Sequence, residues 1–589
     1  MHLESTDWAV VVLYFIVSAG IALLLARRAR RSLDDYFVTG RSLPWWLAGT
    51  SMVATTFAAD TPLAVTGLVA KHGIAGNWLW WNMALSGMLT VFFFSRLWRR
   101  AGVLTDVEFA ELRYSGTGGA ILRATRSVYL ALPINLIIMA WVSRAMITIL
   151  QTSLGVDGVT ATAILFCITA AYVMLSGLWG VVITDFLQFI IAMLGSIVLA
   201  VIAVNAVGGL DELARLSQQH FGHVQTGGGF FPAMDGSWLP VTTLLVFLAV
   251  QWWAAWYPGA EPGGGGYIAQ RMLSTRDERQ SLLATLWFNI AHYAVRPWPW
   301  ILVALVASIQ YPNLENPEQG YVRVMMDLLP SPLKGLLLAA FAAAYMSTIS
   351  THLNWGASYL VNDLYLRFFR KQADRKEQVL VGRLATAILV VLAVITVQYL
   401  DSVESGWKIL MALGAGTGSV LILRWYWWRI NAWSEISAMV ASFVTAITVQ
   451  YYFGFNATDP SGAGYAIVML WTAGVTTLTW IIVTFLTPAE DAQTLERFYQ
   501  KVRPGGWGWG KVARHLGYTR DSIPGGALSW LNWICAVAAV YATLFGCGEL
   551  LLGSATKGMA WLSGAAVSFA VISYNLYRDR GLRDTARVQ

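Results

Sequence analysis

Hydrophobic runs of about 18 or more residues recur along the whole chain, and each is long enough to cross the hydrocarbon core of a bilayer as a helix. Only 12% of the 589 residues are charged, about half the share of an ordinary soluble domain. Inside a bilayer every backbone N–H and C=O group needs a partner, so runs of this length are expected to form helices. The sequence therefore predicts an all-α polytopic membrane protein with about 15 spans.

The basic residues predict the topology. The net charge is +7, and most of the 40 Lys and Arg residues lie in one alternating set of loops. Arg144 and Arg296 lie within spans. The opposite set of loops holds Lys71, Arg215, Arg323, Lys334, Lys408 and Lys557. By the positive-inside rule, this asymmetry places the N-terminus outside and the C-terminus inside. We expect a multi-pass plasma-membrane protein, in a bacterial inner membrane, that contacts lipid, has no nucleic-acid partner and functions as a monomer.

Two predicted spans contain residues that break helices. The second span, about residues 43–70, contains ATTFAADTP at 54–62, and the seventh, 238 to about 272, contains WYPGAEPGGGG at 256–266. Proline and clustered glycines interrupt a helix, and irregular backbone at membrane depth must line a cavity or lie buried in protein. Paired interrupted spans in corresponding positions point to the midplane binding site of a transporter. These two lie five helices apart in opposite orientation, which predicts two inverted five-helix units.

This pattern divides the chain into five parts. We expect a leading helix and basic loop at 1–42, a first inverted repeat (spans 2–6) at 43–207, an external loop at 208–237, a second inverted repeat (spans 7–11) at 238–430, and C-terminal extra helices at 431–589 that include a cytoplasmic loop at 488–529.

The ninth predicted span carries four hydroxyl side chains in the five residues STIST at 347–351. At about 100° per residue, Ala344, Ser347, Thr348 and Thr351 fall on one stripe, and Ser350 lies on its flank. Neutral oxygen atoms at membrane depth suit an alkali cation better than zinc or copper. The alternative is that these hydroxyls bond to carbonyls of their own helix or hold helices together.

Four segments together resemble the sodium:solute symporter family, which includes sodium/glucose, sodium/proline and sodium/sialic-acid symporters. They are DYFVTGRSLPWW at 35–46, GLWGVVITDFLQ at 177–188, GYIAQRML at 266–273 and MSTISTHLNWGASYLVNDLY at 346–365. The resemblance covers the first to about the eleventh span. It implies a LeuT-like 5+5 inverted-repeat core with one leading helix, followed here by about four extra C-terminal helices.

The resemblance also implies sodium ligands. The family's main site uses the backbone carbonyls of Ala54, Phe57 and Ala344 and the hydroxyls of Ser347 and Thr348. A second site in some members matches Asp185, Ser350 and Thr351. A buried carboxylate needs a partner, and a cation beside hydroxyls supplies one. The alternative for Asp185 is that it caps the N-terminus of the sixth span.

Candidate solute-binding residues carry over from the family less completely. They are Thr56, Ala58 and Thr61 after the sodium carbonyls, Trp80 in the third span, Arg144 in the fourth, and Tyr257 and Glu261 in the interrupted seventh span. A buried Arg144 can bind a carboxylate through two hydrogen bonds, or it can pair with Asp60 or Glu261 as part of the structure. Arg296 can pair in the same way. His292 and His352 are expected to be packed polar residues.

The predicted function is sodium-driven symport. We expect import of a small polar organic solute (a sugar, acidic sugar, amino acid or carboxylate) by alternating access, driven by one sodium ion and, if the second site binds, two. The alternative is a membrane sensor that retains a transporter-like core. An enzyme is not expected, because the sequence contains no His-Glu-x-x-His, nucleophile elbow or paired Cys and His.

Overall fold

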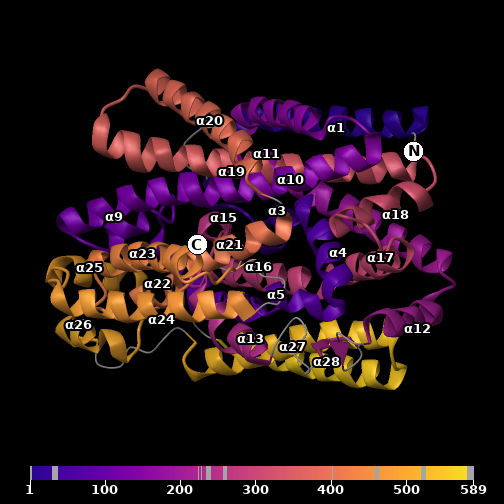
Figure 1. The fold of residues 1–589 in the computed structure, drawn as a ribbon. Helices are drawn as coiled ribbons and strands as arrows, with labels where there is room; N and C mark the ends of the chain where they lie inside the picture. Colours follow the sequence, from indigo (N-terminus) through magenta and orange to yellow (C-terminus); the bar gives the residue numbers. More distant parts are fainter. Residues whose placement is uncertain are drawn as a thin grey trace.

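The computed structural model describes residues 3–29, 38–222, 225–226, 229–233, 241–255, 262–400, 402–457, 463–518 and 525–579. Their fold is helical apart from one short antiparallel pair of strands, β1 (Gln225–Thr226) and β2 (Phe231–Pro232). The helices run mainly along one direction and form a thick bundle (Figure 1).

The first half of the chain contains many helices that are divided by short 3₁₀ or π turns. Its elements are α1 (Ser5–Ala29), η1 (Thr39–Arg41), α3 (Trp45–Thr56), α4 (Asp60–His72), η2 (Ile74–Asn77), α5 (Trp78–Trp81), α6 (Ala84–Leu89), η3 (Thr90–Phe94), α7 (Ser95–Ala101), α8 (Phe109–Arg113), α9 (Gly116–Tyr129), η4 (Leu130–Ile134), α10 (Asn135–Leu154), α11 (Gly158–Ala206), α12 (Leu210–Phe221), α13 (Val241–Val246), η5 (Phe247–Gln251), α14 (Trp252–Ala254), α15 (Gly266–Ser274) and α16 (Glu278–Ile290).

The second half has longer uninterrupted helices toward its end. Its elements are η6 (Ala291–Val295), α17 (Pro297–Gln310), η7 (Pro317–Gln319), α18 (Gly320–Leu328), α19 (Leu333–Ser358), η8 (Tyr359–Phe369), α20 (Arg375–Val397), α21 (Val403–Gly414), α22 (Thr417–Tyr426), α23 (Ala432–Ile447), η9 (Thr448–Tyr452), α24 (Ala463–Leu486), α25 (Ala492–Val502), η10 (Trp507–Trp509), α26 (Gly510–His515), α27 (Ala527–Leu552) and α28 (Ala555–Arg578).

The described residues contain 9 helices that are long and apolar enough to cross a membrane, or up to 11 if each of two bent helix pairs counts as one span. The sequence predicted about 15 spans. The remaining predicted spans are short apolar helices or, as in the third predicted span, are divided into α5, α6, η3 and α7. The polytopic helical class agrees with the prediction, and the exact number of spans stays a prediction.

Helix α11 covers the fifth and sixth predicted spans, and it cannot be straight. The Phe166 ring contacts the Tyr345 ring at 6.2 Å, whereas Asp185 accepts a hydrogen bond from Ser347. Residues 166 and 185 would lie about 28 Å apart in a straight helix. Both contact nearly the same turn of α19, so α11 must bend between them, where the sequence predicts a turn between spans.

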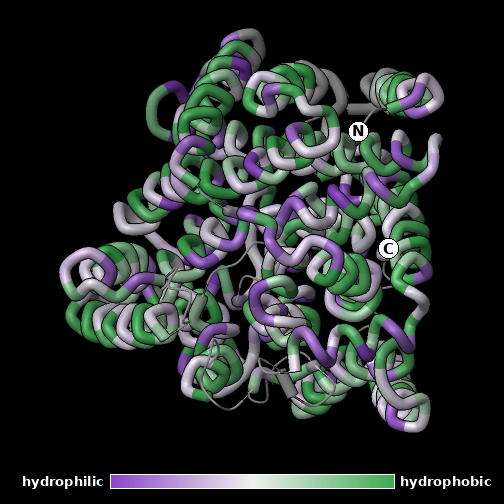
Figure 2. The backbone as a smooth tube through the Cα atoms, turned by 45° about the vertical axis from the view of Figure 1, so that its right-hand side comes forward, coloured by the Kyte–Doolittle hydropathy of each residue, from purple (hydrophilic) through white to green (hydrophobic). Residues whose placement is uncertain are grey.

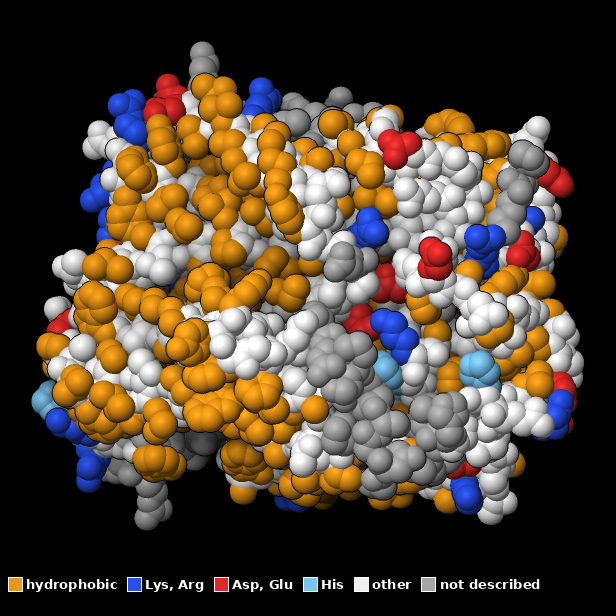
Figure 3. Space-filling model, in the orientation of Figure 1, with side chains coloured by type: hydrophobic (Ala, Val, Ile, Leu, Met, Phe, Trp, Pro, Cys, Tyr) orange, Lys and Arg blue, Asp and Glu red, His pale blue; other side chains and the backbone are white. Residues whose placement is uncertain are grey.

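The outer surface is apolar over broad areas, as expected for helices in contact with lipid. On α20, Leu380, Leu384, Ile388, Val391 and Ile395 recur every three or four residues, and each is at least 50% exposed. Figure 2 shows hydrophobic segments along most helices, and Figure 3 shows continuous hydrophobic areas over the left and lower parts of one face. Helix α1 packs on α11 and α19, and α27 and α28 pack together on the opposite side of the bundle (Figure 1).

A polar cluster, buried except for Lys71, joins α4, η7 and α21 at the end of the bundle that the sequence predicts to be external. Lys71 and Lys408 each lie 2.8 Å from a carboxylate oxygen of Glu404. The Glu318 carboxylate accepts the backbone N–H of Val403 at 3.1 Å and is 4% exposed. Glu318 lies outside the candidate spans. Burial, with a smaller contribution from Glu404, raises the pKa of Glu318 to about 7, although Lys71 opposes the shift.

The raised pKa of Glu318 predicts a pH-dependent stability. Between about pH 4.5 and pH 7 the unfolded chain ionises this carboxyl and the folded chain does not, so rising pH lowers the free energy of unfolding by about 1.4 kcal/mol per pH unit. Glu318→Gln removes the charge. We expect the melting temperature of Glu318→Gln, relative to wild type, to increase from pH 5 to pH 7.5 in tryptophan-fluorescence melts.

The matched control is Glu212→Gln, because Glu212 forms an exposed pair with Arg215 on α12 and such pairs contribute little. Its difference from wild type should stay nearly constant over the same pH range. A melting-temperature difference between Glu318→Gln and wild type that is equally constant would contradict the raised pKa of Glu318.

Candidate functional site

The span formed by α3 and α4 is broken in its middle. Helix α3 ends at Thr56 and α4 begins at Asp60, and their axes are bent by 56°. Pro62 lies in the first turn of α4, where proline is tolerated because the N–H groups of that turn lack intrahelical partners. The break leaves the last carbonyls of α3 without helical N–H donors, so they need other partners at membrane depth.

Side chains bond to three carbonyl oxygens of the last turn of α3: Arg296 to Val53 at 3.3 Å, Thr348 to Thr55 at 3.3 Å and Thr61 to Thr56 at 3.2 Å. The Val53 carbonyl also accepts the backbone N–H of Phe57 at 2.8 Å. The carbonyl of Ala54 accepts the backbone N–H of Phe57 at 3.0 Å. In the described part of the chain, no side chain donates to the carbonyls of Ala54 or Phe57. These are the two α3 oxygens that the family resemblance assigns to sodium.

The hydroxyl stripe of α19 lies against this break, as the sequence predicts. Thr348 Oγ1 reaches Thr55 of α3 and also lies 3.1 Å from the carbonyl of Ala344, one turn earlier in α19. Ser350 donates to the Ser347 carbonyl at 2.8 Å. The hydroxyls therefore combine contact with α3, through Thr348, and bonding to their own helix.

Asp185 of α11 is the centre of a buried polar group between α3, α15 and α19. Its carboxylate accepts hydrogen bonds from Ser51 at 2.6 Å and from Ser347. Arg271 of α15 lies 3.9 Å from the same carboxylate, and both side chains are 0% exposed. The guanidinium also lies 5.9 Å from the centre of the Tyr267 ring. Asp185 contacts one α19 hydroxyl, that of Ser347, and its predicted grouping with Ser350 and Thr351 stays a prediction. Arg271 adds a positive charge that was not predicted.

The alternative in which Asp185 caps a helix is wrong, because the chain is helical on both sides of Asp185 and its carboxylate bonds to the side chains of Ser51 and Ser347. Thr351, one turn after Ser347, has a buried hydroxyl without a hydrogen-bond partner among the described residues. Asp185, Ser347 and Thr351 thus offer oxygen atoms in one region, in which Arg271 and a second cation would compete for the carboxylate.

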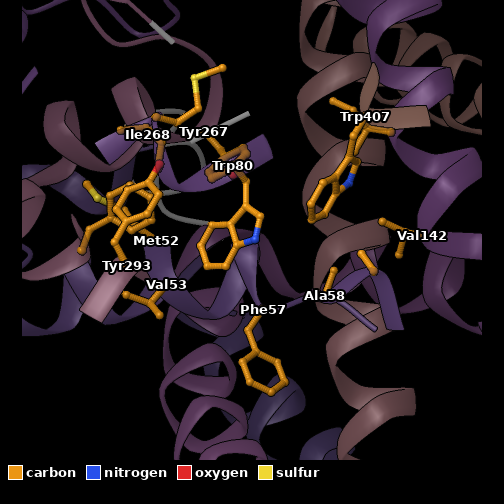
Figure 4. Packing of buried hydrophobic residues seen from close by; sticks show 14 of the residues in the cluster. Met52, Val53, Phe57, Ala58, Trp80, Val142, Tyr267, Ile268, Tyr293 and Trp407 are labelled. Carbon is orange, nitrogen blue, oxygen red and sulfur yellow. The ribbon is translucent and has the colours of Figure 1, made fainter. Parts of the chain in front are cut away.

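An aromatic cluster lies near the break between α3 and α4 (Figure 4). Trp80 of α5 stacks on Tyr293 of η6 at 5.8 Å between ring centres and meets the edge of His292 at 5.6 Å. Figure 4 shows Trp80 and Tyr293 on one side of the α3 break, with Trp407 and Val142 on the other. Trp80 is 2% exposed. A role of Trp80 in solute binding stays a prediction.

Arg296 and His292 contact the predicted solute residue Thr56. Arg296 donates to Thr56 Oγ1 at 3.1 Å, and the His292 ring nitrogen Nδ1 lies 3.1 Å from the same hydroxyl. Asp60 interacts electrostatically with Arg296. Among the described residues Asp60 forms no ion pair with Arg144, whereas pairing of Arg144 with Glu261 stays a prediction, because Glu261 lies outside the described residues. The Nε atom of Arg144 is buried without a hydrogen-bond partner there.

Several predicted residues have less defined roles. Ala58 is buried near the break, and Thr61 bonds to Thr56 as described above. Tyr257 and Glu261 lie outside the described residues. The helices on either side of them end at Ala254 and begin at Gly266.

A further break, between α21 and α22, was not predicted. Helices α21 and α22 are bent by 53° at Ala415 and Gly416, within a stretch that the sequence analysis assigned to one continuous span. The N–H of Gly416 donates to the carbonyl of Ala254 at 2.9 Å, at the end of α14. Gly416 has a positive φ of 88°, a conformation that glycine adopts without steric cost. The sequence signal was the pair Gly414 and Gly416.

The sequence did not lead us to Ser51 and Arg271 as partners at the site, and it did not predict the contacts of His292 and Arg296 with Thr56. Arg271 belongs to the GYIAQRML segment, and Ser51 lies one helical turn before Thr55, so both had a sequence signal. Arg296 was expected, like Arg144, to pair with Asp60 or Glu261, and the structure shows an electrostatic interaction with Asp60. Its hydrogen bonds to α3 were not expected. Its pairing with His292 could be expected from their spacing of four residues.

Comparison with known proteins identifies the family. The model of the sodium:solute symporter family matches residues 36–443. The chain belongs to the sodium:solute symporter family. This symporter is 26% identical over 500 residues to sodium/glucose cotransporter 4 of Danio rerio, covering 77% of this chain and 73% of that protein. It is 24% identical over 477 residues to a sodium/glucose cotransporter of Vibrio parahaemolyticus, covering 76% and 86%.

A solved structure supports the fold of this symporter. It is described as the substrate-bound outward-open state of a Na⁺-coupled sialic acid symporter, with a TM-score of 0.66 and 18% identity, covering 83% of this chain and 99% of that chain. The family resemblance, sodium coupling at the level of the family and the transporter class are therefore confirmed. The protein is a multi-pass membrane transporter and not an enzyme.

The buried pair of Asp185 and Arg271 predicts a strong interaction between two substitutions. Asp185→Asn leaves Arg271 buried without its counter-charge, which costs about 3–5 kcal/mol. Adding Arg271→Gln removes that charge. We expect the double variant to melt at a higher temperature than the sum of the two single losses predicts.

The control cycle is Glu377→Gln with Arg370→Gln, an ion pair whose arginine is 63% exposed. The two substitutions should each lower the melting temperature only slightly, and their effects should add. Additive losses at Asp185 and Arg271 as well would show that the two groups do not interact.

Proposed function

We propose that this protein is a sodium-driven secondary active symporter that imports a small polar organic solute by alternating access. The observation that carries the proposal is the contact between Thr348 of α19 and Thr55 at the broken end of α3. It places neutral hydroxyls beside carbonyls freed from a helix at membrane depth, and such oxygens suit an alkali cation.

The first proposed sodium site uses the carbonyls of Ala54, Phe57 and Ala344 and the hydroxyls of Ser347 and Thr348. The distribution of hydrogen bonds supports it, because the described side chains bond to Val53, Thr55 and Thr56 and leave the carbonyls of Ala54 and Phe57 to other partners. Binding requires Ser347 to turn its hydroxyl from Asp185 toward the ion, which links this site to the carboxylate.

The second proposed sodium site uses Asp185, Ser350 and Thr351. The unpartnered buried hydroxyl of Thr351 and the carboxylate of Asp185 support it. Arg271 opposes it, since its charge already stabilises the carboxylate. An occupied second site therefore requires the guanidinium to move away from Asp185, and Ser350 to turn from its own helix.

The number of sodium ions sets the accumulation that the transporter can reach. A cation entering down about 100 mV releases roughly 2.3 kcal/mol, and a tenfold gradient adds about 1.4 kcal/mol. Two ions supply roughly 7 kcal/mol, enough for about 10⁵-fold accumulation, whereas one ion reaches about the square root of that.

The solute site is proposed between the break in α3 and α4 and the residues Trp80, His292 and Tyr293. Sugars, acidic sugars, amino acids and carboxylates all remain candidates. The names of the similar proteins favour a sugar or an acidic sugar. Arg144 of α10 is the proposed anchor for an acidic group. The division into inverted units at 43–207 and 238–430, the external N-terminus and function as a monomer in a bacterial inner membrane belong to the same proposal.

No observation supports the alternative of a membrane sensor with a transporter-like core. The similar proteins are transporters, and the described helix α25 of the predicted cytoplasmic loop packs on α7 and α8.

The direct test is uptake into proteoliposomes that contain the purified protein. Sugars, sialic-type acids, amino acids and carboxylates are offered in external sodium, potassium or choline buffer. We expect at least one solute to accumulate in sodium buffer only. Thr348→Ala removes a ligand hydroxyl and should raise the sodium concentration for half-maximal uptake about tenfold.

The matched control is Ser358→Ala, since the Ser358 hydroxyl bonds to the carbonyl of Trp355 in the same helix. Its sodium dependence should equal that of wild type. Equal uptake in potassium or choline buffer would contradict the proposed function.

The second sodium site has its own test. If two ions bind, Ser350→Ala and Asp185→Asn should each reduce the Hill slope for sodium toward one. Wild-type slopes above one that neither substitution changes would refute the second site and leave the first intact.

A further inference from the structure

Arg296 is a fully buried cation at the broken end of α3. It follows the π turn η6 and precedes Pro297, the first residue of α17, and it is 0% exposed. A π turn inserts one extra residue into a helix and changes the direction in which the following side chains point. This turn directs Arg296 toward α3.

The Arg296 guanidinium bonds directly to the last turn of α3. Nη1 donates to the carbonyl of Val53 at 3.3 Å and to the hydroxyl of Thr56 at 3.1 Å. The Thr56 hydroxyl in turn lies 2.8 Å from the same Val53 carbonyl. A cation that bonds to the last carbonyls of a helix is stabilised by the helix dipole and fixes those peptide groups. Val53 directly precedes Ala54, a proposed sodium ligand.

His292 orients this guanidinium and connects it to the aromatic cluster. Arg296 Nη2 lies 2.5 Å from His292 Nδ1. Arginine has no acceptor atom, so Nδ1 must accept this hydrogen bond, and the neutral ring then carries its proton on Nε2. The same ring meets Trp80 at 5.6 Å and Tyr293 at 4.4 Å between ring centres. Trp300 supports the guanidinium from another side at 5.2 Å.

We propose that Arg296 is a positioning residue for sodium: it holds the last turn of α3 in the shape that presents the carbonyls of Ala54 and Phe57 to the ion, and His292 links this shape to Trp80 and Tyr293. Arg296 contacts α3, the helix that carries the sodium-binding carbonyls, and it contacts the aromatic cluster through His292. A solute that moves the cluster therefore changes the affinity for sodium. The proposal rests on the proposed function for the existence of the sodium site.

The test uses sodium alone as the probe, with purified full-length protein in detergent and no solute. Melting temperature is followed by tryptophan fluorescence while sodium replaces choline at constant ionic strength. Arg296→Gln should raise the sodium concentration for half of the maximal stabilisation about tenfold. Arg296→Lys keeps the charge and loses the paired hydrogen bonds, so it should give a smaller increase. His292→Leu removes the acceptor and should shift the value in the same direction.

The control is Arg113→Gln. Arg113 is also 0% exposed and also donates to carbonyls at a helix end, those of Arg424 and Trp427 at 2.9 and 3.1 Å. It lies on α8, away from the α3 break. This variant should lower the melting temperature without sodium and leave the half-stabilising sodium concentration unchanged.

Each outcome has a distinct meaning. If Arg296→Gln does not fold, Arg296→Lys and His292→Leu carry the test. The positioning role would be overturned if the half-stabilising sodium concentration of the folded variants equalled that of wild type, or if Arg113→Gln raised it by the same factor, while sodium still stabilised wild type. A wild type that sodium does not stabilise more than choline would instead contradict the proposed function itself.

Discussion

The structure depends on the need to satisfy the backbone carbonyls that a broken helix exposes inside a membrane. Where α3 ends at Thr56, no N–H group of α4 reaches the last carbonyls of α3, and hydrocarbon offers no donors. Thr61 of α4 and Thr348 of α19 supply donors to the carbonyls of Thr56 and Thr55, and Arg296 at the start of α17 adds a donor to the carbonyl of Val53, which also accepts the N–H of Phe57. These contacts fix the relative positions of the elements that meet at the break.

Two charged side chains inside the bundle, Arg296 and Arg271, also need partners, and each has an opposite charge nearby. Arg296 is balanced electrostatically by Asp60, and Arg271 by Asp185. A buried charge without a counter-charge or hydrogen bonds is costly, so each of these pairs favours the arrangement in which its helices remain together. A sodium ion entering beside Ser347 competes with this arrangement. Ion binding is thereby connected to the contacts among α3, α11, α15 and α19.

The sequence predicted those parts of the fold that depend on local chemistry. Pro62 and Asp60 in an apolar run predicted the break, and the spacing of Ser347, Thr348 and Thr351 predicted a polar stripe that faces it. Partner choice was not local. The pairing of Arg271 with Asp185, and the place of Arg296 at the carbonyl of Val53, depend on which helices pack together. The break at Gly416 was missed because no proline marks it and the glycines around it lie within a longer apolar run.

The most direct measurement is a high-resolution experimental structure of the protein in sodium buffer. We predict a density peak with oxygen ligands at about 2.4 Å from the carbonyls of Ala54, Phe57 and Ala344 and the hydroxyls of Ser347 and Thr348, absent when choline replaces sodium. A structure in which α3 and α19 are separated at this level, or in which sodium binds elsewhere and leaves these oxygens bonded to protein, would contradict the account.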